Sequence, residues 1–98
     1  MATPLVMPIV GNKNIGKVNR WIKSEGDHVN EGEIIAELSG PDEEIKYKAP
    51  QEGTLLRIIT NENVVVHSGS LLGIIGIPGE DLSTIIEPRT PNPIFKTK

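Results

Sequence analysis

Three carboxylates and two lysines are the residues of this sequence best suited to chemistry. The carboxylates are Asp42, Glu43 and Glu44, and the lysines are Lys46 and Lys48. Paired carboxylates can act as general acid and base when a cleft desolvates one of them, and a lysine amine can be acylated. A turn at this point would leave all five side chains in water. We therefore expect solvated carboxylates and solvated lysines, with Lys46 or Lys48 paired to Glu37.

The turn lies in the segment Gly40-Pro41-Asp42-Glu43. Proline at the second position of such a segment suits a type I turn because its φ angle is fixed. Apolar residues alternate with polar ones on both sides of the turn, at the period of two that strands require. The sequence therefore predicts a β-hairpin whose tip presents Pro41 and Asp42 to solvent.

Other residue types add no candidate site. The chain has no cysteine, which excludes disulfides, thiolate nucleophiles and sulfur-ligated metals. His28 and His67 each stand beside a predicted turn without a third ligand near them, so we expect no zinc site. Ser39, Ser68 and Ser70 lack the neighbouring base that a nucleophile needs. We expect no catalytic residue and no metal.

The composition favours a small all-β domain. The chain has 98 residues, 37% of them hydrophobic, with one Phe, one Trp and one Tyr. Its core must therefore consist mainly of Ile, Leu and Val, which favour strands, while ten Gly and eight Pro indicate many turns. The net charge of −3 is spread along the chain, so we expect no nucleic-acid partner and no membrane surface as partner. No segment is long and apolar enough to span a bilayer, and we expect a cytoplasmic location, or the mitochondrial matrix for a mature eukaryotic fragment.

The chain repeats itself at an offset of 37 residues. Residues 16–38 align without a gap on residues 53–75, with apolar positions kept and glycines shared. Gly26 aligns with Asn63, and both residue types tolerate a positive φ. The repeat predicts two similar sheets that pack as a flattened β-sandwich about a pseudo-twofold axis.

Alternation of apolar and polar residues predicts the strands. They cover residues 4–10, 17–23, 29, 34–38, 45–49, 54–60, 64–66 and 71–77. We expect the domain to comprise residues 1–77. Residues 78–98 form a Pro-rich tail or the start of a linker, and its prolines at 88, 91 and 93 predict that residues 88–98 do not pack.

Several motifs together resemble one family. They are Met7-Pro8, Gly16-Lys17-Val18, Trp21, Gly26-Asp27-His28-Val29, Gly32-Glu33 and Ala49-Pro50-Gln51-Glu52-Gly53. With the hairpin, they resemble the biotinyl/lipoyl family, most of all the N-terminal lipoyl domain of dihydrolipoyl acyltransferases of 2-oxo acid dehydrogenase complexes. The resemblance implies an all-β barrel-sandwich hybrid with the modified hairpin at one end. It also implies that the loop of residues 11–15 lies close to that hairpin and takes part in partner recognition.

The resemblance also identifies the position at which this family attaches its cofactor. Lipoyl domains carry lipoate on the lysine of an Asp-Lys pair at the hairpin tip. Counting back from Ala49-Pro50 without a gap, these two positions are Pro41 and Asp42. A carboxylate cannot form the amide that the lysine amine forms, so we expect no lipoate here. Lys46 is the fallback attachment residue.

The resulting functional hypothesis is a non-enzymatic lipoyl-like domain that does not carry lipoate. It would act as a structural or interaction module among the protein partners of a 2-oxo acid dehydrogenase-like complex. The alternatives are a genuine swinging-arm acyl carrier, with lipoate as cofactor, and the N-terminal fragment of a dihydrolipoyl acyltransferase.

Overall fold

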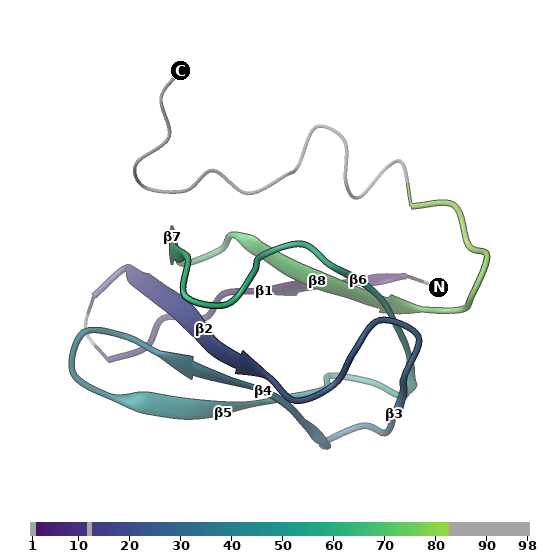
Figure 1. Cartoon of the computed structure of the whole chain (residues 1–98), viewed down its shortest axis with the longest axis horizontal. Coiled ribbons are helices and arrows are strands. Elements are labelled where there is room, and N and C mark those ends of the chain that lie inside the picture. The colour runs from purple at the N-terminus through teal and green to yellow at the C-terminus, as the bar shows by residue number, and fades with distance from the viewer. Residues whose placement is uncertain (1, 12, 83–98) are drawn as a thin grey trace.

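Eight strands form two four-stranded antiparallel sheets in the computed structural model, which describes residues 2–11 and 13–82 (Figure 1). The strands are β1 (Thr3–Val6), β2 (Ile15–Trp21), β3 (His28–Val29), β4 (Ile34–Ser39), β5 (Glu44–Lys48), β6 (Gly53–Ile58), β7 (Val65–His67) and β8 (Leu71–Gly76). One sheet has the order β1-β8-β6-β3 and the other β5-β4-β2-β7. The predicted flattened β-sandwich is confirmed. Among the described residues there is no helix that could cross a membrane.

Every predicted strand is present, and the largest difference lies in the first. The sequence predicted residues 4–10, whereas β1 ends at Val6. Pro8 has no N–H group to donate to a ladder. The chain then turns tightly at Gly11, which has a φ of 74°, and Val10 forms an isolated bridge with Lys13.

The internal repeat is confirmed in detail. Strands β2, β3 and β4 correspond to β6, β7 and β8, and the β2–β4 and β6–β8 pairs have their register shifts at equivalent places, between Val18 and Arg20 and between Leu55 and Arg57. Gly26 and Asn63 both have positive φ angles, of 95° and 69°. The position therefore requires a left-handed backbone in both copies, and a glycine or an asparagine satisfies it.

The core lies between the inner faces of the two sheets. Its fully buried side chains are aliphatic, among them Val18 and Leu55, and Val29 and Val66, which are repeat equivalents. Trp21 packs against the edge of this core, and its indole N–H donates to the carbonyl of Thr60 at 2.9 Å. A second, smaller apolar cluster forms where Leu82 packs with Leu71 and Ile74.

The position of the hairpin follows from the pairing of β4 with β5. Its tip, residues 40–43, lies at the end of the molecule opposite the start of β1 and the end of β8 (Figure 1). This is the arrangement that the resemblance implied. The domain boundary at residue 77 stays a prediction, and the predicted behaviour of residues 88–98 falls outside the described residues.

Candidate functional site

The tip of the β4–β5 hairpin exposes the residues that the sequence singled out. Pro41 and Asp42 are both exposed, as predicted. Ser39 pairs with Glu44 at the base of the tip, and the amide of Gly40 donates to the carbonyl of Glu43 at 2.9 Å. This hydrogen bond runs in the sense opposite to the one that characterises the predicted type I turn.

Gly40 holds the tip against the preceding loop. A Cβ atom on Gly40 would lie 2.6 Å from the carbonyl oxygen of Val10, so only glycine allows this approach. Val10 is buried beneath the tip, and the side chain of Glu43 reaches over Gly11, with its Cγ 3.7 Å from where a Cβ on Gly11 would stand. The loop after β1 therefore lies directly against the hairpin, as the resemblance implied.

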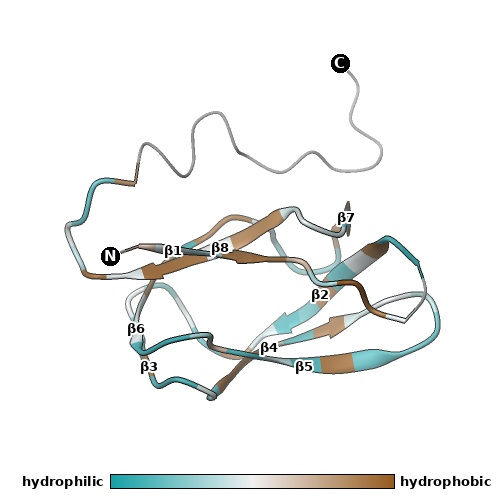
Figure 2. Ribbon diagram, turned by 180° about the vertical axis from the view of Figure 1, so that it is seen from behind, coloured by the Kyte–Doolittle hydropathy of each residue, from teal (hydrophilic) through white to brown (hydrophobic). Residues whose placement is uncertain are grey.

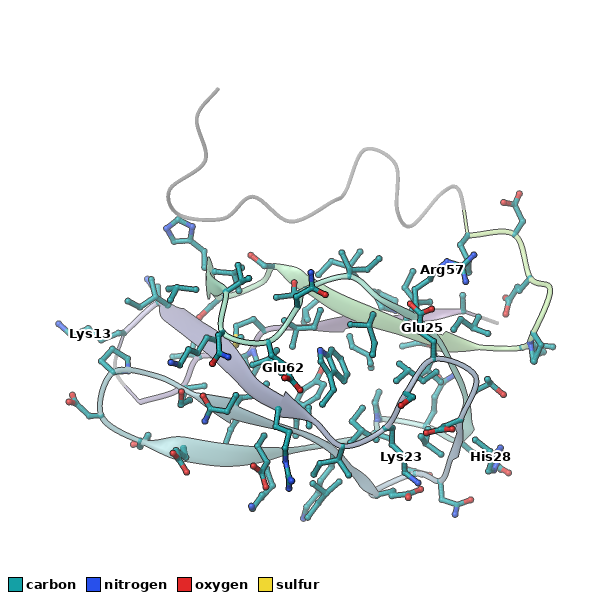
Figure 3. The ribbon with its side chains drawn as sticks, in the orientation of Figure 1. Lys13, Lys23, Glu25, His28, Arg57 and Glu62 are labelled. Carbon is teal, nitrogen blue, oxygen red and sulfur yellow. The ribbon has the colours of Figure 1, made fainter. Side chains whose placement is uncertain are left out.

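Two shallow hollows flank the tip. One, of about 290 Å³, is mainly apolar and is lined by Ile15, Gly16, Lys17, Ser39, Gly40, Pro41 and Val65. The other is lined by Ile9, Gly11, Asp42 and Glu43. The sequence alone did not identify Lys17, Val65 or Ile9 as neighbours of the tip, because they come from β2, β7 and the loop after β1. Lys13, on the same loop, lies at this end of the molecule, opposite His28 (Figure 3).

The carboxylates of the tip are arranged for solvation. Asp42, Glu43 and Glu44 are all exposed. General acid–base catalysis needs a carboxyl group that its surroundings partly desolvate, and a hairpin tip gives no such enclosure. The geometry therefore favours a charged surface feature over a catalytic pair.

The first lysine of β5 is already engaged, and its predicted pairing with Glu37 is confirmed. The Lys46 Nζ lies 2.9 Å from the Glu37 Oε2, and the Arg20 Nη2 lies 3.3 Å from the same oxygen. The hydrogen bond from Lys46 is the main reason that the pKa of Glu37 lies below its ordinary value. Lys48 is exposed and stands opposite Ile34 of β4.

The two histidines belong to different places in the fold. His28 lies in β3, with its Nε2 3.3 Å from the Glu52 Oε2, and both side chains are largely exposed. His67 lies in β7 and pairs with Ile15 of β2. Among residues 2–11 and 13–82, no three His, Cys, Asp or Glu side chains are grouped so that they could hold a metal ion.

A tyrosine that the sequence did not single out joins the two sheets near this hairpin. Tyr47 of β5 packs against the main core, and its phenol is hydrogen-bonded to the backbone of Val6 in β1. Burial raises the pKa of the phenol above its ordinary value. The contact fixes β5, and with it the tip, relative to β1.

Comparison with known proteins identifies the family of this fold. The Biotin_lipoyl family model, described as "Biotin-requiring enzyme", matches residues 3–75. The chain is 38% identical over 91 residues to the "Dihydrolipoyllysine-residue acetyltransferase component of pyruvate dehydrogenase complex" of Rickettsia bellii, a match that covers 89% of this chain and 21% of that protein. It is 36% identical over 83 residues to the "Dihydrolipoyllysine-residue acetyltransferase component of acetoin cleaving system" of Bacillus subtilis, covering 84% of this chain and 21% of that protein.

The matched region is thus about a fifth of the length of these relatives. Family match, sheet topology and internal repeat agree with one another. The chain belongs to the biotinyl/lipoyl family, as a lipoyl-type domain related to the dihydrolipoyllysine-residue acetyltransferases.

Proposed function

We propose that this chain is a lipoyl-type domain that does not carry lipoate and that has no catalytic activity of its own. It acts as an interaction module among the protein partners of a 2-oxo acid dehydrogenase complex. The observation that carries the proposal is the exposed Asp42 at the hairpin tip, the position that the gapless count from Ala49-Pro50 assigns to the attachment lysine of the family.

The residues at the tip do not fit an amide-linked lipoate. The attachment needs an amine at the apex, and Pro41, Asp42 and Glu43 offer none. The amine next along the chain, that of Lys46, lies within β5 and is held by Glu37 at 2.9 Å. A lysine in a paired strand presents its amine from the face of the sheet and not from the tip. This geometry favours the non-carrier hypothesis over the acyl-carrier alternative.

The preserved scaffold supports the role in a complex. The sandwich, the hairpin and the loop packed beneath it are all present. Two of the relatives are named as components of a pyruvate dehydrogenase complex and of an acetoin cleaving system, which supports partners of this class. They are bacterial proteins, which supports a cytoplasmic location.

Co-expression with an active lipoate ligase tests the attachment. We expect the parent chain to keep the intact mass of the unmodified protein. We expect the double variant, Pro41→Asp with Asp42→Lys, to show at least partial addition of a lipoyl group. Lys46→Arg, which keeps the positive charge but removes the acylable amine, is the matched control. A lipoyl adduct on the parent that disappears in Lys46→Arg would establish the carrier alternative instead.

Binding to purified catalytic subunits of the pyruvate dehydrogenase complex from the same organism tests the second half of the proposal. We expect the unmodified parent chain to bind at least one of them. Absence of binding to every subunit would refute the interaction role, whatever the mass measurement gives.

A further inference from the structure

The internal repeat allows the outer faces of the two sheets to be compared position by position. On the outer face of the β1-β8-β6 sheet, Leu82 is 8% exposed and packs with Leu71 and Ile74. Ala2, Leu56 and Ile59 complete this cluster as half-buried neighbours. The strap, residues 77–82, thus covers an apolar area of its own domain with a leucine.

The equivalent area on the other sheet has two aliphatic side chains in the same places. Ile22 is the repeat equivalent of Ile59, and Ile34 is that of Leu71. The backbone is also equivalent, because the amide of Ile22 donates to Ile35 at 2.9 Å as that of Ile59 donates to Leu72 at 2.8 Å. Ile22 is 41% exposed and Ile34 is 37% exposed, whereas Leu71 is 6% exposed. We call Ile22 and Ile34 the uncovered shelf.

The surroundings of the uncovered shelf are charged where those of its counterpart are apolar. In the first sheet, Pro4 and Val6 of β1 pair with Ile74 and Leu71. At the corresponding places in the second sheet, Lys46 and Lys48 of β5 pair with Glu37 and Ile34. Figure 2 shows the difference, with β1 and β8 mainly hydrophobic and much of β5 and β2 hydrophilic.

Cations outnumber carboxylates around the shelf, although the chain is acidic overall. The cations are Arg20, Lys23, Lys46 and Lys48, and the carboxylates are Glu33, Glu37 and Asp27, the last of them near Lys23. The carboxylates are already engaged: Glu33 by Lys23 at 2.8 Å, Glu37 by Lys46 and Arg20, and Asp27 by the backbone N–H of Ser24 at 2.8 Å. Within the described part of the chain Lys48 makes no ion pair, and it stands directly opposite Ile34.

We propose that the uncovered shelf docks an extended segment of a partner protein that carries an aliphatic side chain next to a carboxylate. The aliphatic group covers Ile22 and Ile34 as Leu82 covers Ile59 and Leu71, and the carboxylate faces Lys48. Charge complementarity selects this chemistry, since Lys48 beside Ile34 makes no ion pair and the carboxylates around the shelf are already engaged. The strap has the same composition, because Glu80 and Asp81 directly precede Leu82.

The docking site goes beyond the proposed function, because it lies on a sheet face and not at the tip. It holds whether or not the hairpin ever carries lipoate. The shelf is small, so the complex is weak and transient, in the class of small signalling and redox interfaces.

A peptide with the sequence of residues 77–82, acetylated and amidated at its ends, is a suitable probe. We expect it to shift the backbone amide resonances of Ile22, Ile34 and Lys48 in the full chain, and a peptide with serine in place of its leucine to lose this effect. Shifts confined to Leu71 and Ile74, which would mean competition with the protein's own strap, would overturn the proposal. So would the absence of shifts.

Substitutions in the protein separate the two contacts. Ile34→Ser and Lys48→Gln should each weaken the binding of the peptide by about fivefold or more. Ile9→Ser and Lys13→Gln, which alter an exposed isoleucine and an exposed lysine at the hairpin end, are matched controls and should leave it unchanged. Lys48→Gln keeps the test valid if Ile34→Ser lowers the melting temperature. Unchanged binding by Lys48→Gln, or an equal loss in the controls, would contradict the proposal.

Discussion

Glu25 and Glu62 hold the two halves of the domain together by reciprocal hydrogen bonds. The carboxylate of Glu62 accepts from the backbone N–H of Trp21 at 2.9 Å, and that of Glu25 accepts from the backbone N–H of Ile58 at 2.8 Å. The two glutamates are repeat equivalents, as are Trp21 and Ile58. Figure 3 shows both carboxylates on the same side of the molecule. Each half thus supplies an acceptor to a strand of the other half.

Replacement of either glutamate should therefore have a similar effect on stability. We expect Glu25→Ala and Glu62→Ala each to lower the free energy of unfolding by about 1 kcal/mol, because each leaves one backbone donor without its partner. Urea unfolding measures the change. Glu31→Ala, at an exposed glutamate in the turn before β4, is the control and should be neutral. A loss in only one of the two variants would show that the symmetry does not extend to the energetics.

The paired surface glutamates make stability depend on pH. Hydrogen bonds from Lys23 and Lys46 hold the pKa values of Glu33 and Glu37 below the ordinary value of 4.5 in the folded state. A depressed pKa contributes stability above the unfolded-state value, and this contribution is lost as the pH falls through the folded-state value. Urea midpoints should therefore decline as the pH is lowered below about 4.5. The double variant, Glu33→Gln with Glu37→Gln, should show a smaller decline of the urea midpoint with falling pH. An unchanged decline would show that other groups cause the pH dependence.

The buried valines of β3 and β7 test the core. Val29→Asp and Val66→Asp should each lower the free energy of unfolding by at least about 3 kcal/mol, because each buries an unpaired charge. Val65→Asp is the matched control, since Val65 is the strand neighbour of Val66 and is 38% exposed. If Val29→Asp and Val66→Asp unfold at the same urea midpoint as the parent, the assignment of these valines to the core is wrong.

Leu82 tests whether the strap belongs to the folded unit. Leu82→Ala should lower the free energy of unfolding by about 2 kcal/mol, since it opens the cluster with Leu71 and Ile74. Ile77→Ala, at a side chain that is 62% exposed, should cost much less. Equal melting temperatures of Leu82→Ala and the parent would support the domain boundary at residue 77 that the sequence predicted.

The sequence by itself determined the architecture. Alternation of apolar and polar residues located all eight strands, because strands place successive side chains on opposite faces. The offset of 37 residues revealed the two halves, and the Gly26–Asn63 equivalence predicted a positive φ that the structure has. The turn segment Gly40-Pro41-Asp42-Glu43 predicted that Asp42 lies exposed at the hairpin tip, since a hairpin is a local structure whose geometry depends on spacing along the chain.

Only the tertiary structure decided what surrounds these residues. Gly40 approaches Val10, and Glu25 and Glu62 form reciprocal bonds, between residues that are far apart in sequence. Their positions depend on how the two sheets stack and on where bulges shift the register, and no local pattern encodes either. For the same reason, only the folded chain distinguishes Ile34, which is exposed beside Lys48, from Leu71, which is covered by Leu82. Both are aliphatic residues at equivalent places in the repeat, and only the packing of Leu82 distinguishes their exposure.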